Sequence, residues 1–179
     1  MNKQIILLIG GPSSGKSTLI EQLKQTGYVC YPEISRQVII EAQQQGIDQL
    51  FLEQPLLFSE LLLKSRIKQY NLAQGENANL IFIDRGIPDV IAYMDYIGNP
   101  VPAFFDDACK THIYSKIFIL PIWKKIYVSD SERYESYEQA ILIQKHLIKT
   151  YKKYGYELID VPKDTVENRL QFIIENLNF

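Results

Sequence analysis

LLIGGPSSGKSTLI, residues 7–20, joins an apolar run directly to a loop of small residues and then to a helical pattern. The loop fits the pattern G-x-x-x-x-G-K-[ST] at every position, with Gly10, Gly15, Lys16 and Ser17 at its fixed points. In such a loop successive backbone N–H groups point into one concavity, where they hold a chain of phosphates. The strand before the loop and the helix after it are the context that the motif requires, which disfavours a chance match by a Gly-rich turn. The stretch therefore predicts a P-loop, a binding site for a nucleoside triphosphate.

The predicted nucleotide-binding loop consists of Gly10, Gly11, Pro12, Ser13, Ser14, Gly15, Lys16, Ser17 and Thr18. Lys16 would reach the outer phosphates as a point charge and act in catalysis, and the Ser17 hydroxyl would bind Mg²⁺. The helix that begins near Gly15 adds the positive end of its dipole. We therefore expect a nucleoside triphosphate in this loop and Mg²⁺ as the cofactor.

A second motif, LIFIDRG, residues 80–86, is a buried strand that ends in an acid. From the edge of the sheet next to the P-loop, Asp84 could hold Mg²⁺, usually through water, whereas the alternative is an Asp that caps a turn. Arg85 stands where many ATPases carry a Glu that activates water, and an arginine cannot be that base. It can instead clamp an acceptor or a transferring phosphoryl group, which favours transfer over hydrolysis. Asp84 does not begin an Asp-x-x-Gly switch, and no Asn-Lys-x-Asp guanine reader occurs.

A third motif, YPEISRQV, residues 31–38, follows the expected second strand. Pro32 ends that strand, and Glu33 and Arg36 lie three apart on one side of a starting helix. Glu33 could accept the proton of an attacking hydroxyl, and Arg36 could fix the substrate. The alternative is a capping Glu that pairs with Arg36 within the helix.

A polar segment, residues 123–137, precedes a long helical pattern and has the character of a lid. Arg133 is the preferred candidate for a cation that arrives on closure and neutralises charge in the transition state. The alternative is a solvated basic loop, which is what most surface charges form. Trp123 is the best candidate for stacking on a base, although most of the neighbouring aromatic residues are expected in the core.

Strand and helix patterns alternate along all 179 residues, so we expect one P-loop domain over 1–179. Apolar runs predict strands at 5–9, 28–31, 80–84, 116–120 and 156–161, and amphipathic patterns predict helices at 17–25, 56–72, 134–154 and 165–177. This order predicts an α/β fold, namely a three-layer α/β/α P-loop NTPase sandwich with a mostly parallel five-stranded sheet.

The composition is that of a globular protein, with 46% hydrophobic and 22% charged residues. A net charge of −2 gives no reason to bind nucleic acid or anionic membranes. Residues 5–9 are too short to span a bilayer, and two cysteines are too few for a disulfide framework. We therefore expect a cytoplasmic protein without nucleic-acid or membrane partners.

The chain resembles the family of small P-loop AAA-type domains that includes the nicotinamide riboside kinase domain of NadR. Four segments, in this order, carry the resemblance: the P-loop, PEISR, FIDRGIPDVIAY and the segment before YKKYGYELIDVP. More distantly, they are similar to deoxynucleoside and thymidylate kinases. The resemblance implies that residues 10–18 bind the triphosphate, that Glu33 and Arg36 face the acceptor, and that residues 161–164 hold the adenine. It also implies that Asp84 and Arg85 lie between magnesium and the acceptor, and that Arg133 belongs to the lid. SDSER stands where family members often have Asp-Gly-x-Arg.

The expected activity is that of an ATP-dependent kinase that transfers the γ-phosphoryl group to a hydroxyl of a nucleoside or riboside. Arg36 and Arg85 would position this small-molecule acceptor, with Trp123 as a further contact, and either Glu33 or Asp84 would be the base. A homodimer is compatible with this expectation. The alternatives are a nucleotide-dependent binding or regulatory module and a slow ATPase.

Overall fold

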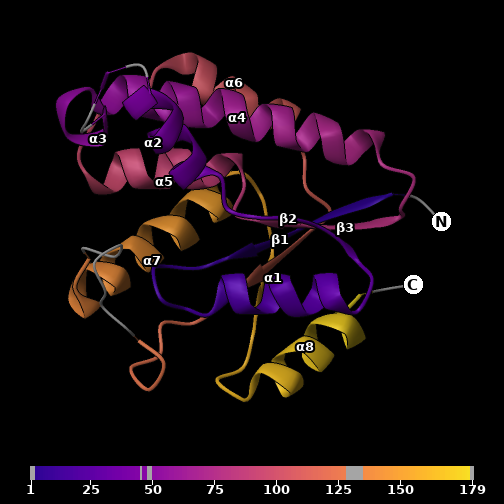
Figure 1. The fold of residues 1–179 in the computed structure, drawn as a ribbon. Coiled ribbons are helices and arrows are strands. Elements are labelled where there is room, and N and C mark those ends of the chain that lie inside the picture. Colours follow the sequence, from indigo (N-terminus) through magenta and orange to yellow (C-terminus); the bar gives the residue numbers. More distant parts are fainter. Residues whose placement is uncertain (1–2, 45, 48–49, 128–134, 178–179) are drawn as a thin grey trace.

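The computed structural model describes residues 3–44, 46–47, 50–127 and 135–177. Its sheet contains five strands in the order β2-β3-β1-β4-β5, and every neighbouring pair is parallel (Figure 1). The strands are β1 Gln4–Ile9, β2 Val29–Tyr31, β3 Leu80–Asp84, β4 Lys116–Ile119 and β5 Leu158–Asp160. The predicted parallel sheet and the three-layer fold are confirmed.

Helices cover both faces of this sheet (Figure 1). The helices α1 Lys16–Gln25 and α8 Val166–Glu175 lie on one face. The other side carries α2 Ser35–Gln44, α3 Leu50–Glu53, α4 Pro55–Gly75, α5 Ile87–Tyr96, α6 Ala103–Thr111 and α7 Tyr137–Lys153. Parallel strands need such crossover helices, because each strand must return to the same edge of the sheet before the next one begins.

The apolar run of β1 explains why this strand lies in the middle of the sheet. Successive side chains of a strand point to opposite faces. Ile5, Leu7 and Ile9 therefore pack in the core cluster that contains residues of α4, α5 and α7. Ile6 and Leu8 pack in the opposite cluster, with residues of α1 and α8. A strand that is buried on both faces must be apolar throughout, which is the pattern that the sequence shows.

The parallel arrangement brings the chemical motifs to one edge of the sheet. β1 runs into the P-loop, and its residue Leu8 lies opposite Asp84, the last residue of β3. The chain leaves β2 at Tyr31 and reaches Glu33 before α2 begins. Within the described ranges, no helix is both long and apolar enough to cross a membrane.

Candidate active site

The P-loop can form only because glycines occupy its tight positions. Gly10 and Gly15 have φ values of 148° and 88°, a conformation that side chains with a Cβ rarely adopt. A Cβ on Gly10 would lie 2.6 Å from the carbonyl oxygen of Leu120, and one on Gly11 would lie 2.7 Å from Ile122 Cδ1. The loop is thus packed against the segment that follows β4, and this close approach requires glycine.

Lys16 lies over the loop with its ammonium group buried. Its Nζ donates hydrogen bonds to the carbonyl oxygens of Gly10 and Gly11, at 3.0 and 2.9 Å, and to Ser14 Oγ at 3.2 Å. Burial lowers the pKa of Lys16 to about 7, and the positive charge of Arg85 is the second cause of this shift. Anionic phosphates would satisfy this buried cation better than neutral carbonyl oxygens do. Ser17 and Thr18 follow in the first turn of α1 and are exposed.

Two side chains from distant helices hold the loop from outside. Gln144 of α7 accepts a hydrogen bond from Gly11 N at 2.7 Å and donates one to the carbonyl oxygen of Leu120 at 3.1 Å. Arg169 of α8 donates from Nη2 to the carbonyl oxygen of Ser14 at 3.0 Å. The sequence did not single out either residue, because one polar residue on an amphipathic helix carries no distinguishing signal.

Asp84 has the properties of a cation ligand. Its side chain is buried, and within the described part of the chain Oδ1 has no hydrogen-bond partner. Burial raises its pKa, because a buried carboxylate lacks the solvation that water would give it. Oxygen ligands are those that Mg²⁺ prefers, and the exposed Ser17 hydroxyl is a second one. These residues therefore fit Mg²⁺. Among the described residues, no group of three or more His, Cys, Asp or Glu is arranged to hold a metal ion.

Glu33 lies between two arginines. Its Oε1 accepts hydrogen bonds from the backbone N–H groups of Ile34 and Ser35 and from Arg66 Nη2, each at 2.9 Å. Its Oε2 pairs with Arg85 Nε at 2.7 Å. Burial alone would raise the pKa of Glu33, but the two guanidinium groups outweigh it and lower this pKa to about 2. Glu33 is therefore a carboxylate at any physiological pH.

Arg66 is a residue of this cluster that the sequence did not reveal. It lies on α4, is 2% exposed, and contacts Glu33 and the carbonyl oxygen of Asp84. The expected alternative for Glu33 was a capping Glu that pairs with Arg36. Glu33 does accept hydrogen bonds from backbone N–H groups at the start of α2, whereas the ion pair comes from Arg66, on a helix farther along the chain. Arg36 itself is exposed near the start of α2.

Arg85 is held from several sides. Its φ of 69° is unusual for a residue other than glycine, and its backbone N–H donates to the carbonyl oxygen of Leu8 at 3.0 Å. The side chain pairs with Glu33 and with Asp89 Oδ1, the latter at 3.2 Å from Nη1, and lies over the Tyr93 ring. Asp89 is fixed in turn by the Tyr151 hydroxyl of α7, which donates to its Oδ2 at 2.5 Å. Protein contacts alone therefore hold the guanidinium in this orientation.

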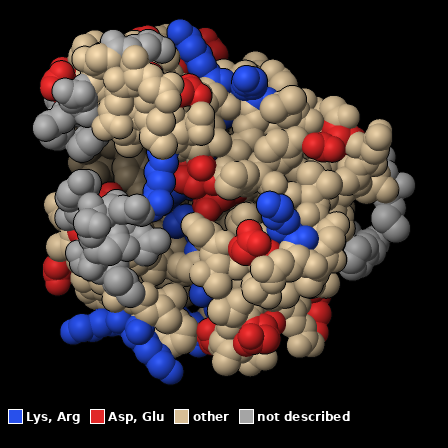
Figure 2. Space-filling view, in the orientation of Figure 1, with Lys and Arg blue, Asp and Glu red and all other residues tan. Residues whose placement is uncertain are grey.

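Figure 2 shows acidic and basic side chains side by side in a hollow near the middle of the drawn face. Such a mixture can contact anionic groups as well as hydrogen-bond donors. Trp123 is partly buried, and Lys125 Nζ lies 5.6 Å from the centre of its ring. Arg133 lies outside the described residues.

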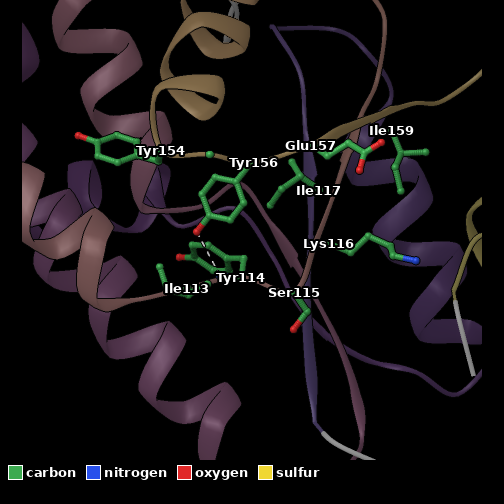
Figure 3. Close-up of a pocket in the computed structure, with 10 residues that line it drawn as sticks. Ile113, Tyr114, Ser115, Lys116, Ile117, Tyr154, Tyr156, Glu157 and Ile159 are labelled. Atoms are coloured by element: carbon green, nitrogen blue, oxygen red, sulfur yellow. Dashed lines mark hydrogen bonds between the residues drawn. The ribbon is translucent and has the colours of Figure 1, made fainter.

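A separate surface cavity of about 350 Å³ lies elsewhere (Figure 3). Residues 113–117 and 154–157 and Ile159 line it, and in the close-up the Tyr156 hydroxyl points toward Tyr114. Residues 113–117 and 154–157 include or precede the amino ends of β4 and β5. The cavity is therefore at the edge of the sheet opposite to the P-loop and belongs to a different part of the surface.

A parallel sheet with a glycine-rich loop after its central strand, a buried lysine in that loop and an acid at the end of the neighbouring strand define a P-loop nucleoside-triphosphate-binding domain. Residues 5–169 match the family model AAA_28, described as an AAA domain. The chain belongs to this family, which confirms the resemblance that its motifs indicated. No curated protein sequence matches the chain.

Solved structures share the fold over nearly the whole chain. Deoxyadenosine kinase from M. mycoides, with the products dCMP and dCDP bound, is 19% identical, and the similarity covers 98% of this chain and 99% of that one at a TM-score of 0.69. Thymidylate kinase from Candida albicans is 16% identical over 97% of this chain and 90% of its own, with a TM-score of 0.71. NadR in complex with NR is 14% identical over 97% of this chain and 49% of NadR, also at 0.71. At these identities the likeness establishes the fold.

Proposed function

We propose that this protein is a magnesium- and ATP-dependent kinase that transfers the γ-phosphoryl group to a hydroxyl of a nucleoside-like small molecule. The observation that carries this proposal is the pairing of Glu33 with Arg85. Arg85 directly follows Asp84, which lies opposite β1 beside the P-loop. A carboxylate that can accept a hydrogen bond from a hydroxyl thus lies close to the groups that would bind the triphosphate.

On the donor side, residues 10–18 would hold the phosphates through backbone N–H groups and the Lys16 ammonium. Ser17 and Asp84 would hold Mg²⁺, which when bound neutralises charge on the phosphate oxygens. Arg133, in the lid-like segment 123–137, would add a cation on closure, and Trp123 would stack on a ring of the acceptor.

On the acceptor side, Glu33 Oε2 accepts a hydrogen bond from Arg85, and a carboxylate oxygen has the capacity for a second one. We assign that second position to the acceptor hydroxyl, with Arg36 as a further contact to the acceptor. A pKa of about 2 makes Glu33 a weak base. Phosphoryl transfer passes through a loose transition state that needs positioning more than proton removal, so a weak base is sufficient. Asp84, whose pKa is raised by burial, is the other candidate base.

The residue after Asp84 supports transfer over hydrolysis. An arginine stands at this position, and its side chain is paired with Glu33 and Asp89. A guanidinium cannot activate water as a base, but it can orient an acceptor. The fold shared with a deoxyadenosine kinase, a thymidylate kinase and NadR supports the same class of reaction.

The proposal is tested by ATP consumption with and without a panel of nucleosides and ribosides. We expect ATP turnover that depends on one class of acceptor, with little hydrolysis in its absence. Glu33→Gln removes the carboxylate that positions the acceptor hydroxyl, so it should lower the rate of transfer by at least ~10²-fold while the affinity for ATP stays the same. Tight ATP binding without turnover under any condition would instead favour a binding module. An unaffected transfer rate would remove Glu33 from the mechanism.

A further inference from the structure

Arg169 is a buried cation for which the described residues provide no acidic partner. Its side chain is 3% exposed, and no ion pair involves it in the described part of the chain. Nη2 contacts the P-loop, whereas Nε has no hydrogen-bond partner among these residues. Burial lowers the pKa of Arg169, and no carboxylate in the described part of the chain opposes this effect. A buried guanidinium without a counter-ion costs free energy, so its presence next to a phosphate-binding loop needs an explanation.

The contact that Arg169 makes fixes the direction of a P-loop amide. In a trans peptide the C=O and N–H bonds point in opposite directions, and the described chain contains no cis peptide. Because Arg169 holds the Ser14 carbonyl oxygen at 3.0 Å, the N–H of Gly15 must point away from α8. A Cβ on Gly15 would lie 2.9 Å from Arg169 Nη1, so the glycine also leaves the room that the guanidinium needs.

We propose that Arg169 is a positioning residue for phosphate binding. It holds the Ser14–Gly15 peptide so that the Gly15 amide faces the triphosphate, and it places a positive charge behind the loop. This proposal rests on the part of the proposed function that concerns the triphosphate, and it is independent of the acceptor. The bound phosphates would supply the negative charge that the protein does not place next to Arg169.

A purely structural role of Arg169 predicts a different outcome of its replacement than the positioning role does. If Arg169 served to pack α8 against α1, its loss would lower the stability of the fold and leave the affinity for ATP unchanged. In the positioning role, replacement by a hydrophobic residue of similar length removes an uncompensated buried charge, which is often neutral or stabilising. The structural role therefore predicts a loss of stability with unchanged affinity for ATP. The positioning role predicts a loss of affinity for ATP without a loss of stability.

The experiment compares Arg169→Met, Arg169→Lys and the control Lys24→Met with the wild type. Lys24 is exposed in the last turn of α1, so its replacement removes the same charge without contacting the loop. Calorimetry with ATP and Mg²⁺ gives the affinity, and denaturant unfolding gives the stability. Loss of a hydrogen bond from a charged donor predicts an affinity for Arg169→Met that is lower by at least about tenfold. We expect its unfolding midpoint not to fall, Arg169→Lys to recover most of the affinity, and Lys24→Met to match the wild type.

Wild-type affinity in Arg169→Met would overturn the proposal, and so would an Arg169→Met protein that does not fold, because it would assign Arg169 to the stability of the fold. If Arg169→Lys remained as weak as Arg169→Met, the role of charge would be overturned. A wild type that binds ATP but phosphorylates no acceptor would contradict the kinase function while leaving the Arg169 result interpretable. A wild type without affinity for any nucleoside triphosphate would contradict both.

Discussion

Glu33 joins three separate parts of the chain at one carboxylate. It follows β2, while Arg66 comes from α4 and Arg85 from the end of β3. Both arginines stabilise this carboxylate, because removing one cation from a largely buried cluster leaves charge that is only partly compensated. The same three residues thus serve stability and orient the groups of the site.

A double-mutant cycle tests this cluster. Arg66→Met should lower the free energy of unfolding by about 3 kcal/mol at neutral pH, since it leaves Glu33 with a single cationic partner. In the Arg66→Met/Glu33→Gln double variant part of this loss should disappear, with a coupling of about 1–3 kcal/mol from urea unfolding.

The control is the exposed pair Lys149–Asp95, which has the same kind of contact at 2.8 Å but side chains that are 71% and 38% exposed. Its coupling should stay below about 1 kcal/mol, as is usual for surface pairs. Equal couplings in the two cycles would mean that burial adds nothing to the Glu33–Arg66 pair.

Part of the charged cluster around Glu33 could be predicted from the sequence, for a physical reason. Glu33, Asp84 and Arg85 lie at or just after the ends of apolar strands, and the ends of parallel strands meet at one edge of the sheet, so these residues could be predicted to lie together. Arg66 could not, because it is one of several polar residues on a long helix, and only the tertiary packing shows which of them points inward. The role of Arg133 stays a prediction.

At the scale of elements, the start of α5 is a tightly packed junction of the site. Gly86 separates Arg85 from the helix, and its N–H donates to Asp89 Oδ2 at 2.9 Å. A Cβ on Gly86 would lie 2.4 Å from Leu7 Cδ1 and 2.9 Å from the Tyr151 hydroxyl oxygen. This glycine is needed for space, since its φ of −125° is open to any residue.

Gly86→Ala should therefore destabilise the protein by about 1–3 kcal/mol through overpacking. The matched control is Gly75→Ala at the end of α4, where an added Cβ would meet nothing within 4 Å. Chemical denaturation of both variants measures the difference, and an equal unfolding free energy for the two would contradict the packing argument.

The sequence predicted the strands and most of the long helices, but it did not predict the buried helix α5. The apolar strand patterns were recognised within a few residues, and so were α1, α4, α7 and α8. No helix was predicted at α5, because Ile87, Val90, Ile91, Ala92 and Met94 are buried together with Pro88 and Asp89. A helix that is buried on most of its surface lacks the polar face from which the 3.6-residue period is read.

At the scale of the whole molecule, the charged cluster of Glu33, Arg66, Arg85 and Asp89 makes stability depend on pH, although the net charge of the chain is only −2. Glu33 contributes stability that depends on pH, because its pKa is about 2 in the folded protein against 4.5 for an ordinary glutamate. A lowered pKa favours the folded state above pH 4.5, and this contribution is lost as the pH falls from there toward 2.

We expect the difference in unfolding free energy between the wild type and Glu33→Gln to be pH-dependent. Its pH-dependent part should be about 3 kcal/mol at pH 7 and should shrink by about half by pH 3. Denaturant unfolding at a series of pH values measures this difference. A difference that stays constant between pH 7 and pH 3 would show that Glu33 has the same pKa in the folded and the unfolded chain.

The helix α7 contacts both halves of the site, through Gln144 at the P-loop and through Tyr151 at Asp89. Seven residues are nearly two helical turns, so both side chains leave the same side of α7, about 10.5 Å apart along its axis. The helix thus fixes the spacing between the P-loop and the Asp89 carboxylate that pairs with Arg85. One inserted residue would rotate one contact by about 100° relative to the other, so the length of this interval is constrained.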